Sequence, residues 1–190
     1  ASDVYKRQAV AVFGVYFKLQ SFIFMPIFGL NNGMIPIVAY NYGARSKKRI
    51  METVWLSIGI AVGIMLIGLM VFHLMTPQLL MLFQADEEML AIGVPALRII
   101  SLSFLFAGYC IIVGSVFQAL GNGLFSLIVS VCRQLFVLLP AAWLLAQTGN
   151  VNNVWWAFLI AEIVSVLMSL AFYAHINKTI IVPLCGPAEP

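Results

Sequence analysis

The sequence predicts an all-α fold, a polytopic bundle of transmembrane helices. Three observations predict it: 63% of the 190 residues are apolar, only 9% are charged, and the mean hydropathy is +1.03. A soluble chain carries roughly 25% charged residues, and a chain this short cannot bury so much apolar surface in one core. The bilayer must therefore be its solvent, which excludes a cytosolic enzyme, a secreted disulfide scaffold and a disordered tail.

The charge and the cysteines exclude further classes. The net charge is +3, from ten basic and seven acidic residues, which is too small for a nucleic-acid partner. The three cysteines, at positions 110, 132 and 185, show neither the spacing of a disulfide framework nor that of a metal site.

Five segments supply the roughly 20 apolar residues that a spanning helix needs. The first, fourth and fifth each carry one internal charge, Lys18, Arg133 and Glu162 respectively. The second is uncharged, and the third is uncharged from residue 99 onward and is expected to begin near Pro95. The first exceeds a ~30 Å hydrocarbon core if it is helical throughout, so it must tilt, kink or project beyond the membrane. The five spans are residues 9–40, 53–75, 95–120, 124–147 and 154–176.

The linkers between the spans differ in charge. Residues 45–49 contain four basic side chains, whereas residues 86–88 contain three acidic side chains. Lysine and arginine in short loops mark the cytoplasmic side of a membrane protein. The first linker and the C-terminal tail, residues 177–190, are therefore expected in the cytoplasm, and the acidic linker outside.

The opening residues conflict with this orientation. Lys6 and Arg7 would lie outside, and residues 1–8 are unlike the apolar span that they precede, so we expect them to be a non-native lead-in. Five spans is also an odd number for a fold made of paired halves, so we expect the N-terminal part of a longer protein to be missing.

Three charged side chains are expected near the middle of the membrane. At ~1.5 Å per residue, Lys18, Arg133 and Glu162 each lie about 12–13 Å from the start of their span. A buried carboxylate must pair or take up a proton, and Glu162 is at the right depth to pair with either Lys18 or Arg133. Such a pair could fix helix packing, or Glu162 could bind cations or protons in a cavity. Both interpretations remain open.

Small residues and prolines indicate where helices approach and bend. Glycines spaced four apart, at 29 and 33 and again at 59 and 63, predict faces where helices pack closely. Pro26, Pro36 and Pro140 are predicted hinges, because transporter motions use such interruptions.

A few polar and aromatic side chains within the spans are candidates for a transport pathway. Tyr16 could contact a cationic compound through its ring. The amides could line a polar cavity, or equally hold neighbouring helices together; they are Gln20, Asn31, Asn32 and Gln118.

The most specific stretch is GLNNGMIPIVAYNYGA, residues 29–44, followed by the basic linker. This stretch resembles the multidrug and toxic compound extrusion (MATE) family, in which a Gly-x-x-x-Gly-x-x-Pro-x-x-x-Tyr-Asn-Gly/Tyr-Gly-Ala pattern marks the point where the second helix of a half meets its cytoplasmic loop. Further similarity lies in PALRIISLSFLF at residues 95–106, FQALGNG at 117–123, RQLFVLLPAAWLLA at 133–146 and WWAFLIAEIVSVLMSL at 155–170.

The resemblance implies five spans, helices 8 to 12, of a twelve-helix transporter with two lobes. It implies a secondary active exporter in a bacterial inner membrane, surrounded by lipid, which exchanges small organic cations for Na⁺ or H⁺ by alternating access. It implies no cofactor and no enzymatic activity, and a partner in the missing N-terminal lobe, without which the chain is expected to be inactive. Helix 95–120 has no Asp or Glu, unlike Na⁺-type members, so the coupling ion stays open.

One alternative has a similar architecture. A flippase for lipid-linked or polysaccharide precursors would need several basic residues in its cavity to hold a pyrophosphate, and Lys18 and Arg133 are the available cations. A membrane-embedded enzyme fits poorly, because it needs clustered His, Asp or Glu.

Overall fold

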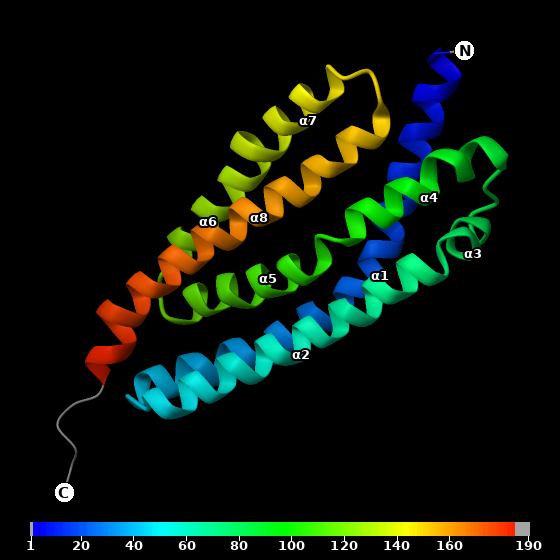
Figure 1. Cartoon of the computed structure of the whole chain (residues 1–190). Helices are drawn as coiled ribbons and strands as arrows, with labels where there is room; N and C mark the ends of the chain where they lie inside the picture. Colours follow the sequence, from blue (N-terminus) through cyan, green and yellow to red (C-terminus); the bar gives the residue numbers. More distant parts are fainter. Residues whose placement is uncertain (1, 185–190) are drawn as a thin grey trace, which may run out of the picture.

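A computed structural model describes the backbone of residues 2–184 and the side chains of residues 6–150 and 152–184. The regular structure of this part of the chain is entirely helical, so the predicted all-α fold is confirmed. The helices are α1 (Ser2–Gly43), α2 (Lys47–Leu74), α3 (Thr76–Met81), α4 (Glu87–Ser101), α5 (Phe104–Ala119), α6 (Gly123–Val131), α7 (Leu139–Ala146) and α8 (Val151–Ile176) (Figure 1).

Four helical stretches are long and apolar enough to cross a membrane, and the bent pair α4–α5 makes a fifth. The four are Lys6–Gly43, Lys47–Leu74, Gly123–Ala146 and Asn152–Leu184. Helix α1 begins at Ser2, so residues 2–8 continue into the first span without a break. Whether they are a non-native lead-in stays a prediction.

The third span differs from its prediction at its start. It begins at Glu87 rather than near Pro95, which lies inside α4. The carboxylate of Asp86 caps this helix by accepting a 2.8 Å hydrogen bond from the backbone N–H of Met89, and Glu87 and Glu88 follow in the first turn, where the helix dipole favours acids. The acidic linker is therefore largely a helix N-terminus.

The third span is also broken. Helices α4 and α5 meet at an angle of 46° around Leu102 and Ser103. No proline lies at the break; instead, the Ser103 hydroxyl donates to the Ile100 carbonyl at 2.7 Å and the Ser101 hydroxyl donates to the Arg98 carbonyl at 2.9 Å. Serine side chains that bond to the preceding turn compete with the helix ladder and bend it.

The fourth span is continuous but irregular. Between α6 and α7 the chain forms a π-helical segment, Cys132–Leu138, that ends two residues before Pro140. Proline has no N–H to donate to the preceding turn, and a local π-turn is one way for a helix to accommodate this. The same arrangement occurs after α8, where the π-helical segment Asn177–Ile181 ends before Pro183. The first residues of the predicted tail therefore continue the last helix to Leu184.

Pro26 and Pro36 both lie inside the single long helix α1, which changes direction along its length (Figure 1). The hinge role of these prolines and of Pro140 stays a prediction.

Helix α5 lies at the centre of the bundle, between the α1–α2 pair and the α6–α7 span with α8 (Figure 1). On the first side, the Phe104 ring meets Phe24 and Phe72 edge to face, at centroid distances of 5.7 and 5.0 Å. On the other side, Phe125 of α6 stacks on Phe172 of α8 at 4.7 Å. Edge-to-face and offset stacking are the favoured geometries for buried rings.

The prediction of close packing at two glycine pairs is wrong for this part of the chain. These glycines are exposed, and an added Cβ would meet no described atom within 4 Å; they are Gly29, Gly33, Gly59 and Gly63. The close approaches occur at other glycines. A Cβ at Gly68 would lie 2.8 Å from Ile23 of α1, and one at Gly108 would lie 2.9 Å from Met65 and 3.4 Å from the Ala61 carbonyl of α2. Spacing alone did not show which face of each helix meets a neighbour.

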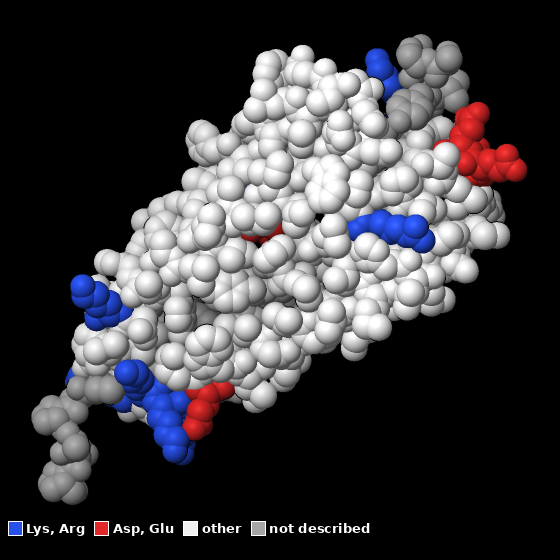
Figure 2. Space-filling view, in the orientation of Figure 1, with Lys and Arg blue, Asp and Glu red and all other residues white. Residues whose placement is uncertain are grey.

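The charged side chains outside the spans gather at the two ends of the bundle (Figure 2). We call the end with the α1–α2 turn, where residues 45–49 lie together with Lys178, the basic end, and the end with residues 86–88 the acidic end. The long, mostly uncharged surface between them is that expected of a protein solvated by lipid.

The Gly108→Leu substitution should lower the free energy of unfolding by about 1–3 kcal/mol, because the new side chain must displace Met65 and the α2 backbone. Gly63→Leu is the matched control: it is also a helical glycine, but it faces open space. Thermal unfolding of the purified protein in detergent measures both. Equal unfolding temperatures for Gly108→Leu and Gly63→Leu would show that α2 and α5 do not meet in this way.

Candidate functional site

The structure brings two of the three mid-membrane charges together. The Arg133 guanidinium donates a hydrogen bond from Nη1 to Glu162 Oε1 at 3.3 Å, and the two side chains are only 27% and 14% exposed. Of the two pairings that depth alone left open, this is the one the fold forms. Lys18 lies elsewhere: it is exposed, and its Nζ sits 5.7 Å from the centroid of the Phe83 ring.

The pair joins the fourth span to α8. Arg133 lies within the π-helical segment, and Glu162 lies near the middle of α8. Packing of fully buried side chains contributes little here, because Val129 is the one residue of the described α6–α7 span that is buried. The ion pair, together with the stacking of Phe125 on Phe172, therefore helps to fix how this span sits on α8. π-Turns frequently occur at functional positions.

One cavity, of about 430 Å³, lies on one side of the pair. We call it the aromatic cavity. It contains four of the candidate residues, Tyr16, Gln20, Arg133 and Glu162, together with a group of phenylalanines. Its remaining lining residues are Phe13, Phe17, Phe24, Phe28, Ser103, Ala107, Ile111, Gln134, Leu138, Phe158 and Ala161.

The rings of the aromatic cavity pack against each other beside the carboxylate. The centroid of Phe158 lies 5.7 Å from that of Phe13 and 6.1 Å from that of Tyr16. Only one carboxylate oxygen of Glu162 is paired; Oε2 is buried and has no hydrogen-bond partner among the described residues. Aromatic faces with a nearby carboxylate suit an organic cation, and the free oxygen suits a cation or a proton.

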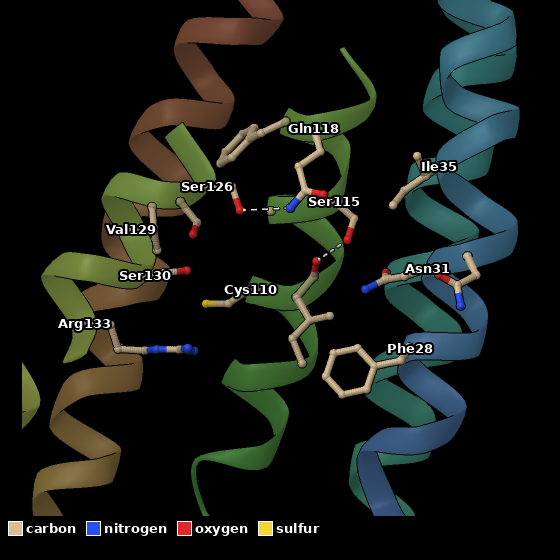
Figure 3. Close-up of a pocket in the computed structure, with 15 residues that line it drawn as sticks. Phe28, Asn31, Ile35, Cys110, Ser115, Gln118, Ser126, Val129, Ser130 and Arg133 are labelled. Carbon is tan, nitrogen blue, oxygen red and sulfur yellow. Dashed lines mark hydrogen bonds between the residues drawn. The ribbon is translucent and has the colours of Figure 1, made fainter. Parts of the chain in front are cut away.

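A second cavity, of about 370 Å³, lies on the other side of Arg133 (Figure 3). We call it the polar cavity. The candidates Asn31, Asn32, Gln118 and Arg133 line it, so the eight candidates fall into these two cavities except for Lys18. Its remaining lining residues are Phe28, Ile35, Cys110, Ile111, Gly114, Ser115, Phe117, Ser126, Val129, Ser130 and Ser169.

Hydroxyl groups are the feature of the polar cavity that the sequence reasoning missed. Ser126, Ser130 and Arg133 are spaced i, i+4 and i+7, and on α8 Glu162 and Ser169 are spaced i and i+7. Residues at these spacings share one helix face. A search for polar rather than apolar residues at helical spacing would have found both sets.

A bundle of membrane-crossing helices with polar and aromatic cavities between them is the architecture of a membrane transporter. The family model described as MatE matches residues 2–144. The chain therefore belongs to the MatE family, and it is an integral membrane protein. The resemblance seen in the motifs is confirmed.

Individual relatives agree. The chain is 26% identical over 166 residues to the multidrug export protein MepA of Staphylococcus haemolyticus. The alignment covers 87% of this chain and 36% of that protein. Among solved structures, it is similar to the MATE multidrug transporter DinF-BH, with 33% identity, a TM-score of 0.80 and coverage of 93% of this chain and 39% of that one. An inward-facing multidrug resistance MATE family transporter shares the fold, with a TM-score of 0.82 at 22% identity, over 95% of this chain and 41% of that chain. The chain thus spans about 36% of the length of the curated relatives it matches.

Proposed function

We propose that this chain forms part of one lobe of a multidrug exporter, which moves organic cations outward in exchange for Na⁺ or H⁺ by alternating access. The observation that carries the proposal is the aromatic cavity with Glu162 in its wall. The multidrug export proteins among its relatives support it. The other lobe is then its partner, and the surrounding solvent is the lipid of a bacterial inner membrane.

The half-paired state of Glu162 suggests how cation binding and ion coupling could meet at one residue. Oε1 is held by Arg133, while Oε2 has no partner among the described residues. An organic cation, a Na⁺ ion or a proton at Oε2 would each neutralise the same carboxylate. Because they compete for one oxygen, arrival of the coupling ion would weaken the hold on the organic cation, which is the requirement for exchange.

The aromatic rings supply the rest of the proposed cation site. Faces of Phe and Tyr attract a cation by about 0.5–2 kcal/mol each, depending on desolvation. Tyr16 is 3% exposed and packs against Phe158, so its ring is held in place before any ligand arrives. A mainly apolar surface with few directional polar groups and one acid suits cations of different shape, as multidrug export requires.

The flippase alternative is not favoured. It requires several cations in one cavity, but Arg133 is the one basic residue lining the two described cavities. The second cation it would need, Lys18, lies outside both.

The Glu162→Gln variant tests the exporter role. In the full-length transporter that carries this chain, we expect it to lower efflux of a fluorescent organic cation, and drug resistance, toward the level of cells without the transporter, while expression stays normal. The amide keeps the shape of the side chain but removes the charge that attracts the cation.

Glu52→Gln is the matched control, because Glu52 is an exposed acid paired with Lys48 at the basic end, outside both cavities. Its efflux should equal that of the parent. If Glu162→Gln also retains full efflux and resistance, the coupling role is lost and the ion pair is purely structural.

The orientation of the bundle is a separate proposal, in which the basic end and the C-terminus lie in the cytoplasm. In a cysteine-free background, Ser46→Cys at the basic end should react with a membrane-impermeant maleimide only after the cells are opened. Glu88→Cys at the acidic end should react in intact cells. Labelling of Ser46→Cys in intact cells would reverse the orientation.

A further inference from the structure

The two cavities differ in the charged groups that line them. The aromatic cavity has both members of the ion pair in its wall, so its formal charge is zero. In the polar cavity, Arg133 is the one charged residue among the described lining residues, and Glu162 does not line it. The charged group that lines the polar cavity is therefore a cation, whose partner Glu162 lies outside the cavity wall.

Arg133 keeps hydrogen-bonding capacity for this cavity. A guanidinium has five N–H donors, and the described contact with Glu162 uses one of them at 3.3 Å. That distance is longer than the 2.7–2.9 Å of a tight charge-assisted bond. Figure 3 shows the guanidinium extending from the α6 side toward the cavity, so its remaining donors are available to a second anionic partner.

Asn31 provides an independent observation on the opposite wall. Asn31 is only 7% exposed, and its Oδ1 has no hydrogen-bond partner among the described residues. Its amide points into the cavity (Figure 3). A buried amide oxygen without a partner costs free energy unless a donor such as a water or a hydroxyl group satisfies it. Its NH₂ group can donate to an anion, while its oxygen accepts from a water or a hydroxyl group.

We propose that the polar cavity binds a small anionic group, a carboxylate, a sulfonate or an inorganic anion, held between the Arg133 guanidinium and the Asn31 amide. The hydroxyls of Ser126 and Ser130 can complete the site, because a serine hydroxyl can donate to an anion; the Ser115 hydroxyl donates instead to a carbonyl of its own helix at 3.0 Å. The volume of about 370 Å³ lies within the range of small-ligand sites. This site adjoins the proposed cation site, with which it shares Arg133, but it does not depend on the exporter function.

The sharing of Arg133 gives the anion site a consequence for the cation site. A guanidinium drawn toward an anion in the polar cavity shields Glu162 less, so the carboxylate would attract a cation more strongly. The two cavities would then favour each other's occupation, and by thermodynamic reciprocity each ligand would raise the affinity for the other.

The test places a reporter thiol in each cavity of a cysteine-free protein in permeabilised membranes. Ser130→Cys reports on the polar cavity, since Ser130 is exposed to it one turn before Arg133. Gln20→Cys reports on the aromatic cavity. Each thiol is reacted with a sulfonate-bearing and with a trimethylammonium-bearing methanethiosulfonate, and the ratio of the two rates is divided by that of a free thiol in solution. The ratio cancels differences in thiol reactivity and access.

For Ser130→Cys we expect the normalised ratio to favour the anionic reagent by at least about five-fold, because a nearby fixed charge concentrates opposite charges. For Gln20→Cys we expect no anion preference. Adding Arg133→Gln to Ser130→Cys should bring the ratio to about one. The double variant Arg133→Gln with Glu162→Gln should do the same, and it avoids leaving a buried acid unpaired if the single variant fails to fold.

A competition arm separates general from carboxylate-selective binding. Sodium chloride and sodium acetate should each slow the anionic reagent more in the Ser130→Cys parent than in the double variant. General screening by salt acts on both proteins, so the difference between them reports binding at the site. Slowing by acetate alone would assign the site to carboxylates, and slowing by both would assign it to small anions in general. An anion preference that survives in the double variant, or no preference in the parent, would overturn the proposal.

Discussion

A charge held within the hydrocarbon region of a bilayer needs a partner or water, and the ion pair of Arg133 with Glu162 satisfies that constraint in this chain. Each charge alone costs about 2.5–3.5 kcal/mol on insertion scales, so the two helices that carry them are driven to bring them together. Besides the pair, the span is held by partly buried contacts such as the stacking of Phe125 on Phe172, and Val129 is its one buried described residue. The pair thus contributes to both the depth and the rotation of this span on α8.

The same pair divides the interior of the lobe into two chemical environments. On one side, Glu162 faces a set of aromatic rings; on the other, Arg133 faces amides and hydroxyls. The geometry of the pair is incomplete: it has one described contact of 3.3 Å, and Oε2 has no partner among the described residues. A tight bidentate pair would have fixed the helices equally well but would have left neither cavity with a usable charge.

Much of this could be predicted from the sequence, and the failures have identifiable causes. The spans followed from the runs of apolar residues, and the depth of Arg133 and Glu162 from the rise of a helix. Depth could not choose between Arg133 and Lys18, because the choice depends on rotation about the helix axes. The prediction of close packing at Gly59 and Gly63 failed for the same reason, because spacing identifies a helix face but not the neighbour that it meets. The break at Leu102–Ser103 has no proline to mark it, and depends on where two serine hydroxyls find carbonyls.

The most direct measurement of the central claim is a charge exchange between the two positions. Arg133→Glu and Glu162→Arg would each place two like charges together, and thermal unfolding in detergent should show a large loss of stability for each. Combining both changes restores an opposite-charge pair at the same depth, so the double variant should recover most of the parent's unfolding temperature. A double variant whose loss equals the sum of the two single losses would show that the side chains do not meet.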